Sequence, residues 1–210
     1  MLFAHKIFKV LKWVFLILLA LYLIVVIVRV FQMFALDRTN AQVEKIHNTK
    51  LKLADVMGDN LPPDPGIEAD KTIAGIDANN NGIRDDVELD VFKEYPNSAK
   101  TRAALLQYAL ALQMEVVQPI VNTLIVTEII TEEDRAHSCI GDILVPRKNT
   151  EYIITNLEVN KIYEYVDFIE SKQLNTITRK NAQNEFLKNL RSYGDSNNQT
   201  CDIDVLKLPN

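Results

Sequence analysis

The feature that most constrains this fold is an unbroken apolar run from Trp13 to Val28, WVFLILLALYLIVVIV. With the apolar residues beside it, the segment 10–34 is long enough as a helix to cross the roughly 30 Å hydrocarbon core of a bilayer. Lys12 and Arg29 sit near its ends, where long side chains reach the headgroups. A cleaved secretory signal is the alternative, but its apolar core would span only about 7–15 residues. The sequence predicts an uncleaved transmembrane helix within residues 1–36.

Charge predicts the orientation of this helix. Lys6, Lys9 and Lys12 precede the run, whereas Arg29 and Arg38 follow it, which favours a cytoplasmic N-terminus. Residues 37–210 carry all 28 acidic residues and 19 of the 23 basic ones, a net charge of −9. A segment this acidic is not expected to bind nucleic acid.

Residues 77–88, DANNNGIRDDVE, match the calcium-loop pattern D-x-[DN]-x-[DN]-G-x5-E. Calcium takes about six to eight oxygen ligands, and alternate positions of such a loop supply them from one turn. Gly82 permits the sharp turn in the middle. The expected ligands are Asp77, Asn79, Asn81, the backbone carbonyl of Ile83, Asp85 (directly or through water) and Glu88 with both carboxylate oxygens.

This loop departs from a standard EF-hand. Arg84 takes the eighth position, where paired loops carry an aliphatic residue, and no second complete loop occurs. Three charged ligands predict weak binding, with a dissociation constant of about 10⁻⁴–10⁻³ M as in extracellular modules. A structural calcium ion is therefore expected rather than a regulatory one. The alternative is an asparagine-rich turn that holds no metal.

The half EF-hand resembles the calcium loops of thrombospondin type 3 repeats and dockerin modules. The wider stretch from Leu61 to Tyr95, with Gly-Ile-Arg-Asp-Asp-Val at 82–87, and the ending Cys201-Asp202 are similar to a family of uncharacterised bacterial envelope proteins. That resemblance implies no known activity. Together with the apolar run and the charge distribution, it leads us to expect a single-pass protein of the bacterial inner membrane, with residues 37–210 in the periplasm.

Beyond the membrane segment, the sequence predicts an all-α fold. Four parts are expected: a transmembrane helix (1–36), a polar stalk (37–60), a proline-rich linker with the calcium loop and its exit helix (61–95) and a small helical bundle (96–210).

Several helix boundaries follow from local signals. Thr39 with Gln42 is a candidate capping box, and Leu51 with Leu53 could form a short strand. The apolar stretch 120–130 is expected to be a buried core helix, with a partner-binding helix as the alternative. The remaining expected boundaries are an end near Tyr95 before Pro96, a cap at Ser98, an interruption at Pro119, a start at Thr131, an end at Pro146, a start at Thr150 and a last helix from Thr176 to Tyr193 stopped by Gly194.

Cys139 and Cys201 are the only cysteines, and both lie in the predicted periplasmic part. An even pair outside the cytoplasm favours a disulfide, which would close a loop of about 62 residues and stabilise the fold by at most about 4 kcal/mol in the chain-entropy model. Two separate buried thiols are the alternative.

Catalytic signals are weak. His137 adjoins Ser138 and Cys139 on one predicted helix, where neighbouring side chains point apart. We therefore expect no enzyme activity. The favoured function is a membrane-anchored periplasmic calcium-binding protein that interacts with an unknown envelope protein, and the alternative is an inhibitor or immunity-type protein that binds a toxin or hydrolase.

Overall fold

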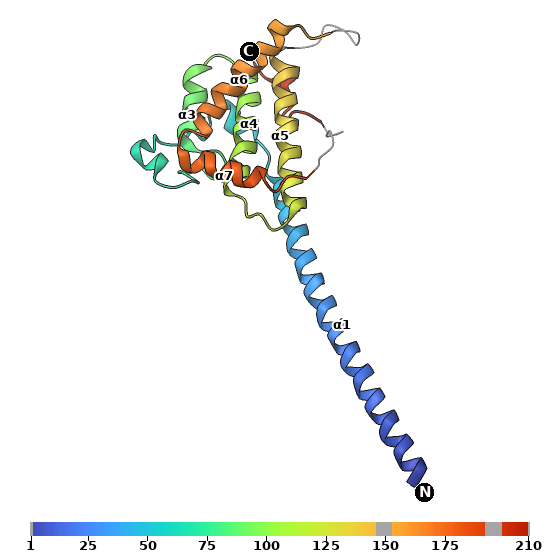
Figure 1. The fold of residues 1–210 in the computed structure, drawn as a ribbon. Coiled ribbons are helices and arrows are strands. Elements are labelled where there is room, and N and C mark those ends of the chain that lie inside the picture. The colour runs from blue at the N-terminus through green and yellow to red at the C-terminus, as the bar shows by residue number, and fades with distance from the viewer. Residues whose placement is uncertain (1, 146–152, 192–198, 210) are drawn as a thin grey trace. The chain divides into compact units, whose positions relative to one another are not determined.

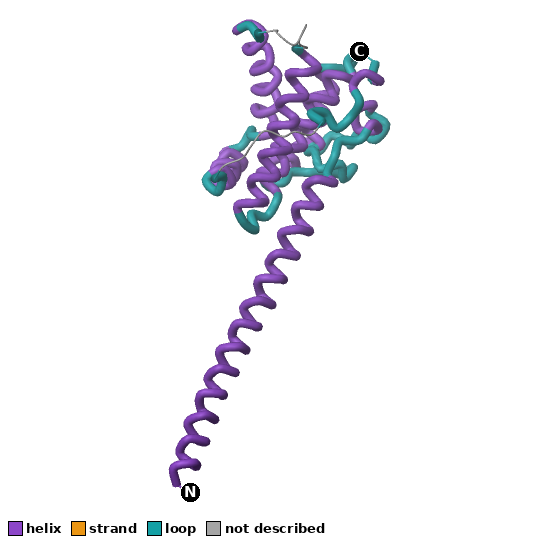
Figure 2. Tube along the Cα trace, turned by 90° about the vertical axis from the view of Figure 1, so that its right-hand side faces the viewer, coloured by secondary structure: helices purple, strands orange, loops and turns teal. Residues whose placement is uncertain are grey.

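The computed structural model describes residues 2–145, 153–191 and 199–209. Within these ranges the chain is all-helical and contains no strand, as predicted (Figures 1 and 2). The chain divides into two compact units, Met1–Gln42 and Val43–Asn210. Each unit is described by itself.

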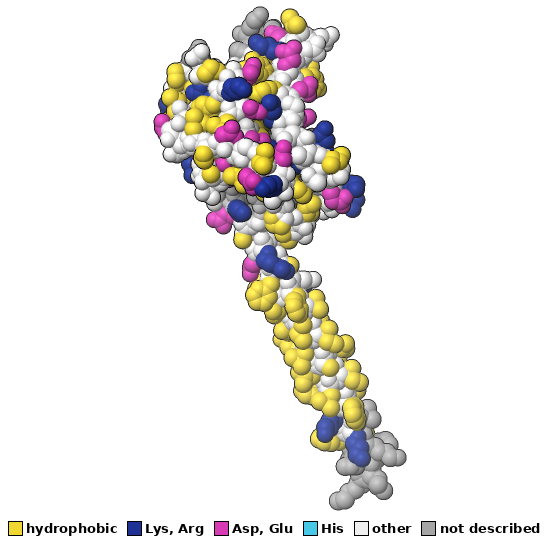
Figure 3. All heavy atoms as spheres, turned by 90° about the vertical axis from the view of Figure 1, so that its left-hand side faces the viewer, with side chains coloured by type: hydrophobic (Ala, Val, Ile, Leu, Met, Phe, Trp, Pro, Cys, Tyr) yellow, Lys and Arg dark blue, Asp and Glu magenta, His cyan; other side chains and the backbone are white. Residues whose placement is uncertain are grey.

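The first unit lies within α1 (Leu2–Asn48), one continuous helix. From residue 7 to residue 36, leaving out residue 10, the apolar side chains of this unit are exposed all around the helix, as Figure 3 shows for one face. Among the residues that the structure describes, α1 alone is long and apolar enough to cross a membrane. The predicted helix start at Thr39 is wrong, because α1 continues through it and the Thr39 hydroxyl donates a hydrogen bond to the carbonyl of Ala35 (3.1 Å).

The second unit begins at Val43, within the predicted stalk, and holds the other helices. They are α2 (Leu53–Met57), the 3₁₀ helix η1 (Gly66–Asp70), α3 (Asp85–Glu94), α4 (Ala99–Val117), α5 (Thr123–Leu144), α6 (Asn156–Gln173), α7 (Ile177–Leu187) and the 3₁₀ helix η2 (Val205–Lys207).

Helix α4 forms the centre of this unit. It packs against α2, α3, α5, α6 and α7 (Figure 1), and its residues are buried from Ala99 through Glu115, apart from the half-buried Lys100. Five alanines in this stretch let neighbouring helices approach closely from several sides. A helix that is buried on all sides is a core helix, so α4 is the element around which the others are positioned.

Side-chain caps fix several helix starts. Ser98 accepts a hydrogen bond from the backbone N–H of Thr101 (3.2 Å), which confirms the predicted cap of α4. Thr155 and Glu158 form a capping box at α6, and Thr176 caps α7. The expected boundaries at Pro146 and Gly194 lie outside the described residues. The helix expected from Thr150 begins only at Asn156, because residues 153–155 are not helical and Thr155 is its cap. The last helix ends at Leu187 instead of Tyr193.

Two local predictions are wrong. No helix starts at Thr131, because α5 continues through it and the Thr131 hydroxyl donates to the Thr127 carbonyl (2.9 Å). The strand at Leu51 and Leu53 does not form either. The backbone N–H of Leu51 donates to the Asp202 carboxylate (3.1 Å), and Leu53 begins α2.

The apolar stretch 120–130 is only partly the buried helix that was expected. Helix α5 begins at Thr123 with Asn122 as its cap, and Ile125, Val126, Ile129 and Ile130 are buried. In contrast, residues 120, 121 and 124 are exposed. Pro119 lies in the break between α4 and α5, as predicted.

The two cysteines lie at disulfide distance, with Cα atoms 5.0 Å apart. Cys139 on α5 thereby holds the chain that follows residue 198. The same chain is tied to α5 by Arg135, which donates to the Asp202 carboxylate, and to α4 by Gln107, whose side chain bonds the backbone of Thr200 and Asp202. The tail is therefore part of the second unit.

Candidate functional site

The loop 77–88 folds into a tight turn held by its first acidic residue. The two carboxylate oxygens of Asp77 accept hydrogen bonds from the backbone N–H groups of Asn81 (3.1 Å) and Gly82 (2.9 Å). Gly82 has a φ of +87°, and a Cβ on it would lie 2.7 Å from Cδ1 of Leu110. Glycine is needed here because both the backbone conformation and the close approach to α4 exclude a side chain.

The second half of the loop passes directly into α3. Ile83 and Val87 are fully buried in the core cluster around α4. The backbone N–H of Asp85 donates to the Ile76 carbonyl (2.9 Å), which closes the loop at its base. The Asp85 carboxylate is buried and accepts from the N–H of Ala78 (3.0 and 3.1 Å), and this burial raises its pKa.

Glu88, the last expected ligand, is also fully buried, and it points back into the loop. Its Oε2 accepts from the amide nitrogens of Asn79 and Asn81 (3.0 Å each). Its Oε1 is buried and has no hydrogen-bond partner. Burial, reinforced by the nearby charges of Asp55 and Asp85, raises the pKa of Glu88 to about 7. A buried carboxylate oxygen with no donor is costly unless a cation or a proton satisfies it.

The structure thus joins the side chains of Asn79, Asn81 and Glu88 through hydrogen bonds. The carboxylates of Asp77 and Asp85 instead accept from backbone N–H groups of the loop, and Ile83 is anchored in the core. In the described residues, no group of three or more histidine, cysteine, aspartate and glutamate side chains is close enough to form a metal site. The expected set relies instead on two asparagines and a carbonyl in addition to its three acids. Its role as a calcium site stays a prediction.

The residues present fit a hard cation nevertheless. The two asparagine amides donate to Glu88, and their nitrogen and oxygen atoms are distinguished only by the hydrogen bonds they make. Their oxygens accept from the backbone N–H groups of Asn81 (3.3 Å) and Ile83 (2.8 Å), so a cation beside Glu88 would have to replace these hydrogen bonds in order to bind the amide oxygens. The unpartnered Oε1 of Glu88 would then add a further oxygen ligand.

Arg84 shows how the loop docks onto the helical domain. Its guanidinium is fully buried, donates to the carbonyl of Gln173 at the end of α6 (2.9 Å) and to Asp86 (3.0 Å). Burial lowers the pKa of Arg84, and the pairing with Asp86 opposes that effect. In paired EF-hands a second loop holds the first in place. Here Arg84, the residue that departs from the EF-hand pattern, holds the loop by binding the C-terminus of α6.

A second buried arginine holds the linker that precedes the loop. Arg179 on α7 donates to the Asp70 carboxylate and to the carbonyls of Ala69, Thr72 (3.0 Å) and Ile73 (3.0 Å). The sequence analysis missed this residue. In the sequence, Arg179 is recognisable only as the third residue of a helix capped by Thr176. That position does not indicate which distant residues it contacts.

A separate group of carboxyls is buried beside α4. Glu115 accepts a hydrogen bond from Gln183 (2.9 Å) through one carboxylate oxygen, and its other oxygen is buried. The side chain of Glu133 on α5 lies at hydrogen-bonding distance from the Glu115 carboxyl. Two carboxyls hydrogen-bond only when one of them carries a proton. Burial first, and repulsion from Glu133 second, raise the pKa of Glu115 to about 9. Tyr108 donates to Glu170 (2.9 Å) beside this pair.

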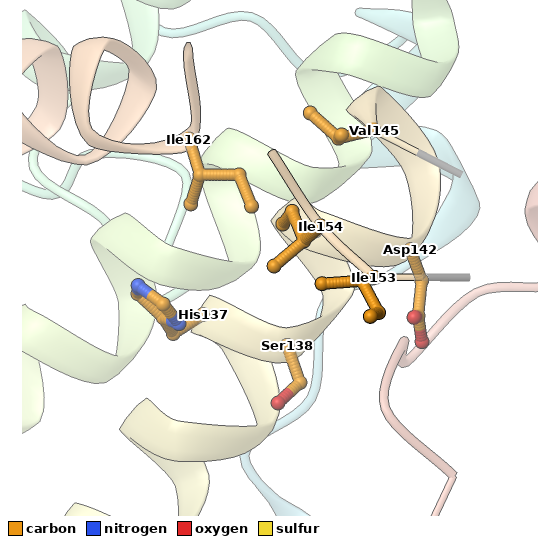
Figure 4. Close-up of a pocket in the computed structure, with 8 residues that line it drawn as sticks. His137, Ser138, Asp142, Val145, Ile153, Ile154 and Ile162 are labelled. Carbon is orange, nitrogen blue, oxygen red and sulfur yellow. The ribbon is translucent and has the colours of Figure 1, made fainter. Parts of the chain in front are cut away.

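An open pocket of about 470 Å³ lies along α5 and is lined by His137, Ser138, Asp142 and apolar residues that include Ile154 and Ile162 (Figure 4). Figure 4 shows the His137, Ser138 and Asp142 side chains lying apart. His137 packs edge-on against Tyr108 (6.5 Å between ring centroids), and Asp142 accepts a hydrogen bond from Thr200 (2.9 Å). These residues therefore do not form a nucleophile–base pair.

Comparison of the chain with protein-family models, with curated proteins and with solved structures found no match. The resemblance to bacterial envelope proteins accordingly stays a prediction.

Proposed function

We propose that this protein is a membrane-anchored calcium-binding protein of the bacterial periplasm, with a structural and interaction role. Calcium bound in the loop 77–88 fixes the linker 61–76 against the helical domain. Helix α1 anchors the protein in the inner membrane with its N-terminus in the cytoplasm. The partner of the helical domain is another envelope protein.

The observation that carries the calcium proposal is the environment of Glu88. Its carboxylate is fully buried, one oxygen has no partner, and its neighbours Asp55 and Asp85 are also acidic. A divalent cation would satisfy that oxygen and offset the repulsion between these charges. The loop sequence independently matches the calcium pattern at its constrained positions.

The contacts of the loop support a structural role for the ion. Asp77, at the start of the loop, follows the linker that Arg179 binds. Glu88, at its end, lies on α3, next to the Arg84 contact with α6. One ion that joins Asp77 to Glu88 therefore connects the linker to the helical domain. Because the ion would bind the folded loop and not the unfolded chain, it would stabilise the fold.

The anchor is supported by the apolar surface of α1 and by the distribution of charge. A fully exposed apolar helix is stable in lipid, not in water. The two cysteines at disulfide distance fit an oxidising compartment such as the periplasm.

Calorimetric titration of calcium into the detergent-solubilised protein tests this proposal. We expect one site with a dissociation constant of about 10⁻⁴–10⁻³ M. Glu88→Gln should abolish the binding heat, whereas Glu94→Gln, which changes an exposed residue of the same helix, should leave it unchanged. Equal heats for the two variants would refute the site. Release of the protein from membranes by alkaline carbonate would refute the anchor separately.

A further inference from the structure

The connection between α4 and α5 exposes apolar side chains that the calcium site and the anchor do not use. Val117, Ile120, Val121 and Leu124 are 40%, 41%, 46% and 46% exposed. We call these four residues the apolar loop patch. The next residue, Ile125, is fully buried, so the patch marks the outer edge of a stretch whose remainder belongs to the core.

The patch is also free of charge in a strongly charged part of the protein. No charged residue occurs between Glu115 and Glu128, although residues 37–210 carry 47 charged residues and a net charge of −9. Isolated exposed apolar residues are normal, but four within eight positions of an uncharged segment are typical of a contact surface. The polar Asn122 within the segment caps α5, accepting a hydrogen bond from the Ile125 backbone (3.3 Å).

The residues that flank the patch pack against the last part of α1. Val43 and Ile46 pack in one cluster with Met114, Ile125 and Val126, which directly flank the patch on α4 and α5. The exposed apolar run of α1 ends at Leu36, seven residues before Val43. Seven helical residues span about 10 Å. A short piece of chain therefore separates the end of the apolar run from the cluster that flanks the patch.

We propose that the apolar loop patch inserts into the headgroup and upper acyl region of the same bilayer that α1 crosses. This inference rests on the proposed anchor. The patch then forms a second, shallow membrane contact in addition to the anchor, which restricts the motion of the second unit. Uncharged apolar residues partition into this interfacial region, whereas the acidic remainder of residues 37–210 is repelled by an anionic surface.

Tryptophan fluorescence in vesicles tests the proposal. Trp13 is the only native tryptophan, so Trp13→Phe gives a background without one. Ile120→Trp in this background is reconstituted into phosphatidylcholine vesicles with or without bromine on the upper acyl chain. We expect blue-shifted emission and at least twofold stronger quenching than for Leu157→Trp, which replaces a residue 79% exposed on α6. Val121→Trp should repeat the result of Ile120→Trp.

Equal quenching of the two variants would overturn the proposal. A blue shift that depends on protein concentration and lacks quenching by bromolipid would overturn it in favour of a second copy of the chain. The unsubstituted protein separates this inference from the anchor, because its Trp13 lies in α1. If Trp13 is quenched and the loop variants are not, only the patch contact fails. If Trp13 is not quenched either, the anchor fails as well.

Discussion

Asp85 and Glu88 are carboxylates that the fold buries completely beside a third acid, Asp55. Among the described residues, neither is paired with a basic side chain at ion-pair distance, in contrast to Asp70 and Asp86, which contact Arg179 and Arg84. Burying a charged carboxylate without a partner costs free energy. The buried carboxylates of Asp85 and Glu88 are therefore stabilised when they bind a proton or a cation. The calcium pattern fixes residue type and spacing together, so it assigns expected ligands from sequence alone, and their role as ligands stays a prediction.

Other features at the residue scale could not be predicted. Arg84 was recognised as a departure from the EF-hand pattern, but its partner, the Gln173 carbonyl, lies 89 positions away. The pairing of Glu115 with Glu133 depends likewise on how two helices meet. The local sequence around a residue does not indicate which distant residues it contacts.

Gly82→Ala should strongly destabilise the protein. Its φ of +87° costs an L-residue about 1–2 kcal/mol, and the collision with Leu110 adds about 1–3 kcal/mol. Gly66→Ala is the matched control, because Gly66 also has a positive φ (+53°) but nothing lies within 4 Å of its Cβ position. Thermal melting should show a larger loss for Gly82→Ala. Equal losses would mean that the loop does not pack against α4 as described.

Glu115→Gln should flatten the pH dependence of stability. The pKa of Glu115 is raised from 4.5 to about 9 in the folded state, so the folded protein keeps a proton that the unfolded chain releases. Stability from this group is fully present below pH 4.5 and is lost as the pH rises towards about 9, at up to about 1.4 kcal/mol per pH unit. Melting temperatures between pH 6 and pH 9 measure this slope.

The control for this variant is Glu185→Gln, which changes an exposed glutamate on α7. It should keep the wild-type slope. Glu88 is present in all three proteins, so its own titration cancels from the comparison. A slope for Glu115→Gln as steep as that of the wild type would contradict the proton-sharing pair.

At the scale of elements, the sequence predicted most helices because their apolar residues recur at three–four spacing around a core. The errors have one physical source. Thr39 and Thr131 look like helix caps, yet each hydroxyl donates to the carbonyl four residues earlier, inside a continuous helix. A threonine hydroxyl can form a hydrogen bond both as a helix cap and inside a helix. Only the tertiary context decides whether a helix begins at such a threonine or continues through it. Leu51 and Leu53 alternate with lysines as strand residues would, but they belong to different local structures. Leu51 is buried before α2, and Leu53 is exposed at the start of α2.

Arg84→Met should loosen the loop from α6. Methionine fills the buried space but leaves the Gln173 carbonyl without its donor and Asp86 without its partner, a loss of about 3 kcal/mol. For a domain of this size, that lowers the melting temperature by about 6–12 °C. Lys172→Met is the matched control, since the Lys172–Asp90 pair also joins α6 to α3 but is solvent-exposed. Such pairs contribute about 1 kcal/mol at most. Similar melting temperatures for both variants would show that Arg84 does not dock the loop.

At the scale of the whole molecule, the proposed function depends on two separate parts of the chain. The apolar surface of α1 predicts a membrane environment, and the loop 77–88 predicts a calcium ion. The sequence predicted both because each depends on a short contiguous segment. The way the loop is held could not be predicted, since linker, loop and tail are fixed by contacts from α4, α5, α6 and α7.

The most direct test of the central claim is the melting temperature of the full-length protein in detergent, measured in 10 mM calcium and in chelator. With a dissociation constant of about 10⁻⁴ M, calcium should stabilise the wild type by about 2.7 kcal/mol, a shift of about 5–10 °C. Glu88→Gln should melt in chelator close to the wild type, because an amide replaces the protonated form of Glu88, and calcium should not shift it. Identical wild-type melting in calcium and in chelator would contradict the account, and the loop would then be a turn that its own hydrogen bonds hold together without metal.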